Sequence, residues 1–344
     1  MAPTATAHRE RGVDPAEPFF SAAAPFLDRL ALFFEEQKEE FEPELSGLVD
    51  YALSHSGKRL RPIALFLTGS GPDGEFTEEM VRAAAVVELV HLATLVHDDI
   101  LDGADVRHEH ETVSRRHGVS AAVLLGDALF AQSLQLASRF PTTEVCRQVS
   151  EATRKICAGE IEQTLDGGND GDGIERYFRI IERKTAVLFQ VSCRLGALLG
   201  RPGPEFSDAA GEFGRRLGIA YQIYDDLVDV IGSESVIGKT LGTDFASGKE
   251  TLPFLLLRES ADREGEPFPV DGLREDAFAD GADPRKLVFE RGVVPRVADY
   301  FHREIAGALR AVDEFDGFGN VDRLRQIAGF VERRFRRLLE LHAE

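Results

Sequence analysis

The sequence predicts an all-α protein. From residue 19 onward, apolar residues recur at i, i+3, i+4 and i+7 along almost the whole chain, which is the spacing of one face of an α-helix. No segment of any length alternates apolar and polar residues as a half-buried strand does. Apolar residues make up 43% of the 344 residues, enough for a substantial core. We therefore expect one large helical domain over residues 19–344, after a disordered segment at residues 1–18.

Breakers divide the helical pattern into separate elements. Stretches rich in Gly, Pro and acidic residues lie at 69–74, 166–173, 200–204 and 261–284. Residues 83–101 are almost wholly apolar, so the helix that contains them should be central and buried, with the helix at 205–232 as its counterpart. In chain order, the expected helices are 24–42, 46–55, 59–68, 77–102, 118–138, 142–165, 174–200, 205–232, 250–260, 284–291, 294–315 and 319–342.

Composition and charge exclude several classes of protein. A net charge of −20 argues against nucleic acid as a partner. The chain has no uninterrupted apolar run of 18 residues, so we expect no transmembrane helix, and its first residues lack the apolar core of a signal peptide. Cys146, Cys157 and Cys193 are odd in number and follow no metal-ligand spacing, which is typical of reduced thiols. We therefore expect a cytoplasmic protein.

Two aspartate triplets of the form DDxxD carry the strongest functional signal. Each follows an apolar helical run, and they are Asp98, Asp99 and Asp102, and then Asp225, Asp226 and Asp229. Positions i and i+4 stack on one face of a helix, so the first and last aspartates of each triplet point the same way. Carboxylates clustered in this way repel each other unless a cation lies between them, and all-oxygen ligand sets suit Mg²⁺. Two such sites that face each other would hold a polyphosphate through bridging metal ions.

A solvated acidic helix face is the alternative explanation, and for a single triplet it would be the better one. Here, however, both triplets are embedded in apolar helices, where unpaired charge is costly. The two together therefore favour a metal site.

The distribution of lysine points to anion-binding positions. Only seven of the 40 basic residues are Lys, and the others are Arg. Four of the seven lie in the local patterns GKRLRP, RKTA, GKTLGTD and GKETLP, as Lys58, Lys184, Lys239 and Lys249. Lysine in a chain that otherwise uses arginine suggests that a point charge is needed there, although scattered surface lysines would also be compatible with the sequence.

Five segments in order identify the family that the chain resembles. They are SGKRLRP (56–62), HLATLVHDDILDGADVR (91–107), VLLGDALFAQ (123–132), ERKTAVLF (182–189) and YQIYDDLVD…GKTLGTDFASGKETLP (221–253). From about residue 25 to its C-terminus the chain resembles the trans-polyprenyl diphosphate synthases. The resemblance implies an isoprenoid synthase fold, a large helical bundle around a central cavity, usually as a homodimer. It also implies a prenyltransferase that adds isopentenyl diphosphate to an allylic diphosphate and releases pyrophosphate.

The resemblance assigns roles residue by residue. Asp98 and Asp102 would hold two Mg²⁺ ions and Asp225 a third, while Asp99, Asp226 and Asp229 complete or orient the ligand shells. The allylic diphosphate would be contacted by Arg107, Lys184, Thr185, Gln222, Lys239 and Lys249. Isopentenyl diphosphate would be held by Lys58, Arg61 and His91, with Arg59 close by. Among these residues, Asp98, Asp102, Asp225, Lys184 and Arg107 would carry the catalytic step.

The chain departs from the family pattern after the first triplet. The family usually has two arginines there, and the second contacts isopentenyl diphosphate. In this chain Arg107 is followed by His108. We expect protonated His108 to replace the missing arginine, with Arg115 or Arg116 as the alternatives.

The helix before the first triplet also bears on product length. Members of the family that stop at fifteen or twenty carbons carry a bulky aromatic residue four or five positions before this triplet. In this chain those positions are Thr94 and Ala93, with Val90 one turn below, and residues 81–97 contain no Phe, Tyr or Trp. We therefore expect products of about C30 or longer, as in the synthases of quinone side chains, along a tunnel lined at the helical spacing. Geranylgeranyl (C20) and farnesyl (C15) products are the alternatives, and a long product would pass to membrane enzymes.

Three other functions compete with this interpretation. A class I terpene cyclase shares the fold and the first triplet, but it needs neither the second triplet nor an isopentenyl diphosphate site. A non-catalytic subunit of a heteromeric synthase would be expected to have lost aspartates. An acidic helical scaffold would not need the lysine patterns. The sequence therefore favours the synthase.

Overall fold

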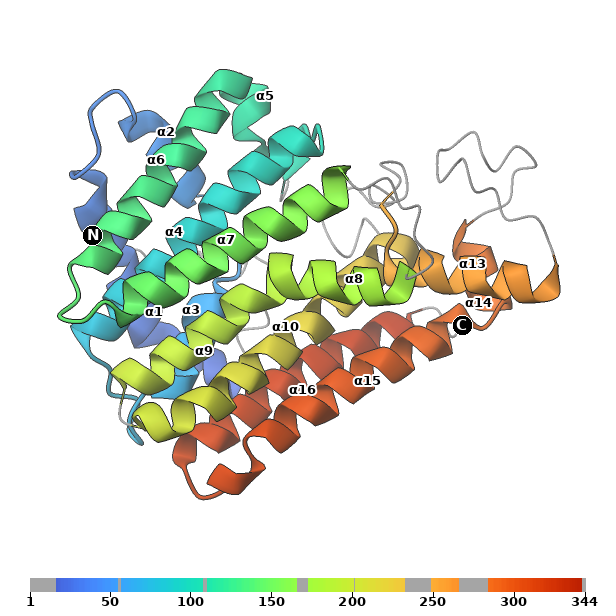
Figure 1. The fold of residues 1–344 in the computed structure, drawn as a ribbon. Coiled ribbons are helices and arrows are strands. Elements are labelled where there is room, and N and C mark those ends of the chain that lie inside the picture. Colours follow the sequence, from blue (N-terminus) through green and yellow to red (C-terminus); the bar gives the residue numbers. More distant parts are fainter. Residues whose placement is uncertain are drawn as a thin grey trace. The chain divides into compact units, whose positions relative to one another are not determined.

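The structure is a computed structural model, and it describes residues 17–54, 57–107, 110–165, 173–200, 202–232, 249–265 and 284–341. The described residues are predominantly helical, which confirms the predicted all-α class (Figure 1). The chain divides into two compact units, each built from several segments. Unit 1 comprises residues 1–154, 188–214 and 311–327, and unit 2 comprises residues 155–187, 215–310 and 328–344. The expected single domain over residues 19–344 stays a prediction.

Unit 1 contains the helices of the N-terminal half. These are α1 (Pro18–Lys38), α2 (Ser46–Ser54), α3 (Leu60–Gly69), α4 (Glu78–Leu101), α5 (Val113–His117) and α6 (Val119–Ser138). It also holds nearly all of α9 (Val187–Leu199), the 3-10 turn η3 (Asp313–Phe315) and the first parts of α7 (Glu144–Leu165), α10 (Pro204–Ile231) and α16 (Gly319–Glu340).

Unit 2 contains the remaining parts of α7, α10 and α16. Its other elements are α8 (Gly173–Ile181), the π-helical segment η1 (Glu182–Ala186), α13 (Leu252–Glu264), α14 (Pro284–Glu290) and nearly all of α15 (Val293–Ala311). In its core the rings of Phe301 on α15 and Phe335 on α16 stack with their centroids 3.9 Å apart.

Most predicted helices have their expected bounds, and the differences have local causes. Helix α1 begins at Pro18, six residues before the predicted start, because proline is well suited to the first turn of a helix. The helix predicted at 174–200 is interrupted by η1. In a π-helix the backbone hydrogen bonds join residues five apart, and not four apart as in an α-helix. A two-residue hairpin was not predicted: β1 (Val106–Arg107) pairs with β2 (His110–Glu111) in antiparallel register. It is too short to show an alternating pattern.

Helix α4 is the core helix of unit 1, as predicted. The hydroxyl of Thr77 caps its start by accepting a hydrogen bond from the amide of Met80 at 3.1 Å. From Met80 to Val96 nearly every side chain is buried, and α6 packs along α4 (Figure 1). Gly103, with φ of +62°, ends the helix directly after the first triplet.

In the part of the chain that the structure describes, two helices, α4 and α6, are long and apolar enough to cross a membrane by length and composition. In α4, 72% of the most apolar stretch is buried inside the protein, as expected for a core helix. In α6 the buried share is only 39%, and Val119, Val123, Leu124 and Leu134 are exposed. The described residues thus leave the apolar face of α6 uncovered.

Candidate active site

The first aspartate triplet lies at the C-terminal end of α4. Asp98 is half-buried, and Asp102 is exposed as the C-cap residue of the helix. Asp99 is buried and accepts a hydrogen bond of 2.7 Å from Nε of Arg107 on β1. Burial raises the pKa of the Asp99 carboxyl, and the charge of Arg107 opposes that effect. The triplet therefore presents its first and last carboxylates, while the middle one fixes the hairpin against α4.

The arginines near this triplet already have protein partners. Arg107, predicted to contact the allylic diphosphate, is held by Asp99. Arg115 lies 3.8 Å from a carboxylate oxygen of Asp105, and the guanidinium of Arg116 lies over the ring of Tyr51 at 4.7 Å. His108 lies outside the described residues, so its replacement of the second arginine stays a prediction.

Arg61 and His91, both predicted to bind isopentenyl diphosphate, form a cluster in unit 1. Nη1 of Arg61 lies 2.9 Å from Nε2 of His91, although 30 residues separate them in the sequence. The guanidinium of Arg61 also lies 4.7 Å from the ring centroid of Phe189 on α9. Lys58 is half-buried just before α3. The structure therefore brings together the pair Arg61 and His91 that the sequence predicted.

Arg59 has an unusual backbone in this cluster. Its φ of +52° and ψ of +37° lie in the left-handed region, which no other non-glycine residue adopts in the described parts of the chain. Its guanidinium lies over the ring of Phe34 at 5.6 Å. Strained residues of this kind persist where the surroundings fix them, often at binding sites. This geometry supports a binding role for the GKRLRP segment.

Glu88 belongs to the same cluster and was missed by sequence reasoning. It lies on α4, three residues before His91, and is only 1% exposed. One of its carboxylate oxygens has no hydrogen-bond partner among the described residues. Burial raises the pKa of Glu88, and the charges of Arg59 and Arg61 oppose the rise. The spacing of Glu88 and His91 on one helix face could have indicated this residue.

We expect Glu88→Gln to stabilise the protein at pH 8 and to lose that advantage as the pH falls. The folded protein holds the Glu88 proton more tightly than the unfolded chain, whose ordinary pKa is 4.5. Stability from this group is therefore fully present below pH 4.5 and is lost as the pH rises through the folded pKa. Each tenfold difference in proton affinity corresponds to about 1.4 kcal/mol.

Urea unfolding of both proteins at several pH values measures this effect. Glu79→Gln, at an exposed position in the first turn of the same helix, is the matched control and should show no such pH-dependent gain. A Glu88→Gln variant that is less stable than the wild type at pH 8 would show that the two arginines outweigh burial.

The second triplet lies near the C-terminal end of α10 in unit 2. Asp225 is half-buried, whereas Asp226 and Asp229 are each 3% exposed. Asp226 accepts two hydrogen bonds, one of 2.6 Å from the hydroxyl of Tyr177 and one of 2.7 Å from Nε2 of Gln222. As in the first triplet, the middle carboxylate is directed toward protein donors.

Lys184 and Thr185 lie in the π-helical segment η1. Such segments often occur at functional sites. Nζ of Lys184 lies 2.5 Å from a carboxylate oxygen of Glu160 and donates to Oε1 of Gln163 at 2.9 Å. The hydroxyl of Thr185 donates to Oε1 of Gln222 at 2.8 Å.

The other two predicted lysines, Lys239 and Lys249, precede α13 in the sequence. Lys249 is half-buried just before α13, and Lys239 lies outside the described residues. Their contacts with the allylic diphosphate stay predictions.

The donor set fits magnesium that arrives together with a diphosphate. Among the described residues, no three His, Cys, Asp or Glu side chains form a group that could hold a metal ion by themselves. Asp99 and Asp226 accept hydrogen bonds from protein donors. Mg²⁺ commonly takes one or two carboxylates and completes its shell with water and substrate phosphates. Asp98, Asp102 and Asp225, the three members that are not buried, would supply such a partial set.

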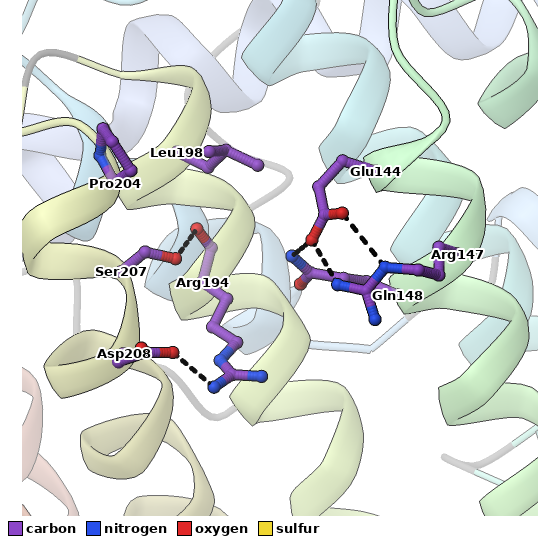
Figure 2. A pocket seen from close by; sticks show the side chains of 8 residues that line it. All are labelled: Glu144, Arg147, Gln148, Arg194, Leu198, Pro204, Ser207 and Asp208. Atoms are coloured by element: carbon purple, nitrogen blue, oxygen red, sulfur yellow. Dashed lines mark hydrogen bonds and ion pairs between the residues drawn. The ribbon is translucent and has the colours of Figure 1, made fainter.

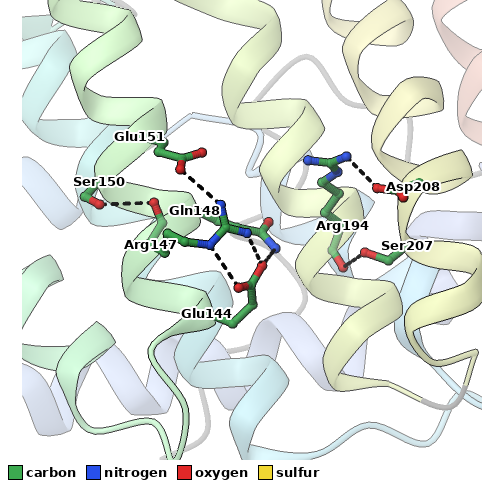
Figure 3. A network of polar contacts seen from close by, with 8 residues as sticks. All are labelled: Glu144, Arg147, Gln148, Ser150, Glu151, Arg194, Ser207 and Asp208. Atoms are coloured by element: carbon green, nitrogen blue, oxygen red, sulfur yellow. Dashed lines mark hydrogen bonds and ion pairs between the residues drawn. The ribbon is translucent and has the colours of Figure 1, made fainter.

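A polar pocket of about 320 Å³ in unit 1 contains none of the predicted site residues (Figure 2). It is lined by Glu144, Arg147, Gln148, Arg194, Leu198, Pro204, Ser207 and Asp208. Arg147 pairs with Glu144 at 2.6 Å and with Glu151 at 3.0 Å, and Arg194 pairs with Asp208 at 2.5 Å (Figure 3). Two arginines and two acidic residues line this pocket, so it offers no excess charge to a diphosphate or a metal ion.

These elements define an all-α protein with two helix-borne aspartate triplets and a separate cluster of cations. The chain belongs to the polyprenyl synthetase family, whose family model matches residues 42–271. It is 36% identical over 230 residues to heptaprenyl diphosphate synthase component 2 of Bacillus subtilis. That alignment covers 67% of this chain and 66% of the relative, just under two thirds of its length.

Two solved structures show the same fold. A heptaprenyl diphosphate synthase from Staphylococcus aureus is 26% identical, with a TM-score of 0.79 over 91% of this chain and 97% of the other. A polyprenyl synthase from Caulobacter crescentus, complexed with calcium and isoprenyl diphosphate, is 28% identical, with a TM-score of 0.79 over 91% and 96% of the chains. The predicted family and the isoprenoid synthase fold are thereby confirmed.

Proposed function

We propose that this protein condenses isopentenyl diphosphate with an allylic diphosphate in the trans configuration and releases pyrophosphate. The observation that carries this proposal is the cluster of Arg61 and His91, in a chain that keeps all six aspartates. A terpene cyclase would have no use for a second diphosphate site. A non-catalytic subunit would have no need to keep both triplets.

The residues divide the chemistry between them. When bound, Mg²⁺ neutralises the leaving diphosphate and so favours cleavage of its bond to the allylic carbon. Asp98, Asp102 and Asp225 would hold these ions, three per site, and Arg107 and Lys184 would bind the diphosphate oxygens. The double bond of isopentenyl diphosphate then attacks the allylic carbon, and the product loses a proton. No protein nucleophile is needed. Water must be kept away from the allylic carbon, which becomes cationic when the diphosphate leaves.

The binding residues fall into two groups with separate substrates. Lys58 and Arg61 bind isopentenyl diphosphate, with Arg59 and His91 beside them. Lys184, Lys239 and Lys249 bind the allylic substrate. Arg61 is already oriented by His91 and Phe189, so little side-chain freedom is lost when a diphosphate binds.

We propose products of about C30 or longer, because no bulky side chain lies one turn before the first triplet. Val90 and Ala93 are fully buried in α4, and Thr94 is half-buried, with its hydroxyl bonded to the carbonyl of His91 at 2.7 Å. The relative from Bacillus subtilis is named a heptaprenyl diphosphate synthase component, and a heptaprenyl product would have this length. A product of this length is itself apolar and would pass to membrane enzymes.

We propose that the protein acts in the cytoplasm. We also propose that it forms a homodimer. The exposed apolar face of α6 supports it, with Leu124 63% exposed and Val119, Val123 and Leu134 also exposed. A second copy would remove this face from water, at about 25 cal/mol for each Å² of apolar surface. Light scattering of the purified chain should give twice the monomer mass. A monomer that becomes active only with a second, different subunit would contradict the homodimer.

Product analysis tests the proposed reaction. The purified protein is incubated with Mg²⁺, farnesyl diphosphate and isopentenyl diphosphate, and pyrophosphate release and dephosphorylated products are measured. We expect release only when both substrates are present, with isoprenoid products of about C30 or longer. Pyrophosphate released from the allylic substrate alone would indicate a cyclase, and none under any condition would overturn the proposal.

A further inference from the structure

A chain of hydrogen bonds in unit 2 connects the second triplet to the segment that carries Lys184. The hydroxyl of Thr185 on η1 donates to Oε1 of Gln222, and Nε2 of Gln222 donates to Oδ1 of Asp226. The hydroxyl of Tyr177 on α8 donates to the other oxygen of Asp226, Oδ2, at 2.6 Å. Both carboxylate oxygens of Asp226 are therefore held by side-chain donors from two different elements.

These hydrogen bonds also fix the orientation of the Gln222 amide. A hydroxyl that donates to Gln222 requires the amide oxygen on the Thr185 side. The amide nitrogen then points at the carboxylate, whereas the flipped amide would place oxygen against oxygen. Both polar atoms of Gln222 are engaged in this way. Its predicted contact with the allylic diphosphate is thus not the role that this geometry favours.

We propose that Tyr177 and Gln222 are positioning residues, which fix Asp226 so that Asp225 is presented to Mg²⁺ and diphosphate in one orientation. This inference rests on the proposed function. Asp226 is 3% exposed, and a buried carboxylate persists only when donors satisfy it. Its neighbour on α10, Asp225, is half-buried and accessible to a ligand. Partners that orient metal ligands in this way usually contribute strongly to metal affinity.

Tyr177 is the informative residue because its hydroxyl can be removed while its ring remains. The ring is buried and lies against that of Phe178, with centroids 5.3 Å apart. Tyr177→Phe therefore keeps the apolar packing and deletes one donor to Asp226. A matched control is Tyr300→Phe in the same unit, where the ring lies 5.4 Å from Phe178 and the residue is half-buried.

The test measures Mg²⁺ binding without catalysis. Inorganic pyrophosphate is the probe, and calorimetry at 25 °C records the Mg²⁺ concentration needed for half-maximal pyrophosphate binding. For Tyr177→Phe we expect this concentration to rise about 10-fold or more, the usual effect of removing such a partner, with no change for Tyr300→Phe. The Michaelis constant for isopentenyl diphosphate should stay the same, because that substrate uses other residues.

Thr185→Val gives a second, independent variant. It removes the hydroxyl that orients Gln222 and should shift the Mg²⁺ requirement in the same direction, so the proposal stays testable if Tyr177→Phe fails to fold. Wild-type Mg²⁺ requirements in both folded variants would overturn the positioning role. If the wild-type protein itself binds no pyrophosphate with Mg²⁺, the proposed function fails, and this inference fails with it.

Discussion

Replacing Asp98 or Asp225 with alanine should lower turnover by several orders of magnitude while the fold is retained. Removal of a single preorganised charge-stabilising group commonly costs about 10²–10³-fold in rate, and loss of a metal ligand should cost at least as much. Both carboxylates are half-buried, so they are accessible to a metal ion. Each substitution also removes one of several like charges, which lowers the repulsion within its triplet. Loss of Asp99 would differ, because it would leave the half-buried Arg107 without this carboxylate partner.

Steady-state kinetics and thermal unfolding of both variants measure this result. Asp208→Ala is a suitable control, because Asp208 also lies on α10 but pairs with Arg194 and not with a proposed ligand. Its turnover should stay near the wild-type value. Near-normal turnover of Asp98→Ala or Asp225→Ala at saturating Mg²⁺ would show that the triplets are not the metal site.

The bounds of most helices could be predicted from the sequence because the apolar period is strong and the breakers are clear. Helix α4 is the best example, since its bounds differ from the predicted range by one residue at each end. The π-helical segment at Glu182–Ala186 could not be predicted in this way. Its side chains continue the helical pattern of α8 and α9, and only the backbone hydrogen bonds differ.

The proposed site could be predicted where several residues of one type recur at a fixed spacing, as in the triplets and the lysine patterns. Tyr177 could not be predicted, because it is one side chain in a short helix with no repeated pattern, and for Glu88 the only signal was its spacing from His91. Their roles depend on neighbours that only the fold supplies: Arg59 and Arg61 for Glu88, and Asp226 for Tyr177. A buried polar side chain within an apolar run needs a partner, so such residues are the ones to test for a function.

The distinction between the middle and outer aspartates also required the structure. From the sequence, all three members of each triplet were candidate metal ligands. The hydrogen bonds show that Asp99 and Asp226 are directed toward Arg107 and Tyr177. Helical periodicity already placed the middle residue about 100° around the helix from the first, but it could not identify the donors that the middle residue faces.

Replacing Ala93 with tyrosine should shorten the product to C15–C20 and leave turnover largely intact. Ala93 is fully buried, and it lies one helical turn before His97 on the same face of α4. That face is directed toward α6, because Nε2 of His97 lies 3.2 Å from the carbonyl oxygen of Val123. A phenol ring at position 93 would project into the space along which the growing chain is proposed to extend, below the metal ligands.

Helices α4 and α6 approach closely near His97, so a tyrosine ring at position 93 should lower the stability of the fold. A Cβ on Gly126 of α6 would lie 2.1 Å from Nε2 of His97, so α4 and α6 have little free space beside His97. Overpacking of this kind typically costs about 1–3 kcal/mol, so the variant should fold but melt at a lower temperature.

Chromatography of the dephosphorylated products measures the effect of the ring on chain length. Ala22→Tyr, which adds the same ring to an exposed position of α1, is the matched control and should leave product length unchanged. Phe130 of α6 could form a floor of its own, since its ring lies 5.9 Å from that of His97. In that case the wild-type product would already stop at C15, and Ala93→Tyr would change nothing. Either of these two results would show that α4 does not limit chain length at Ala93.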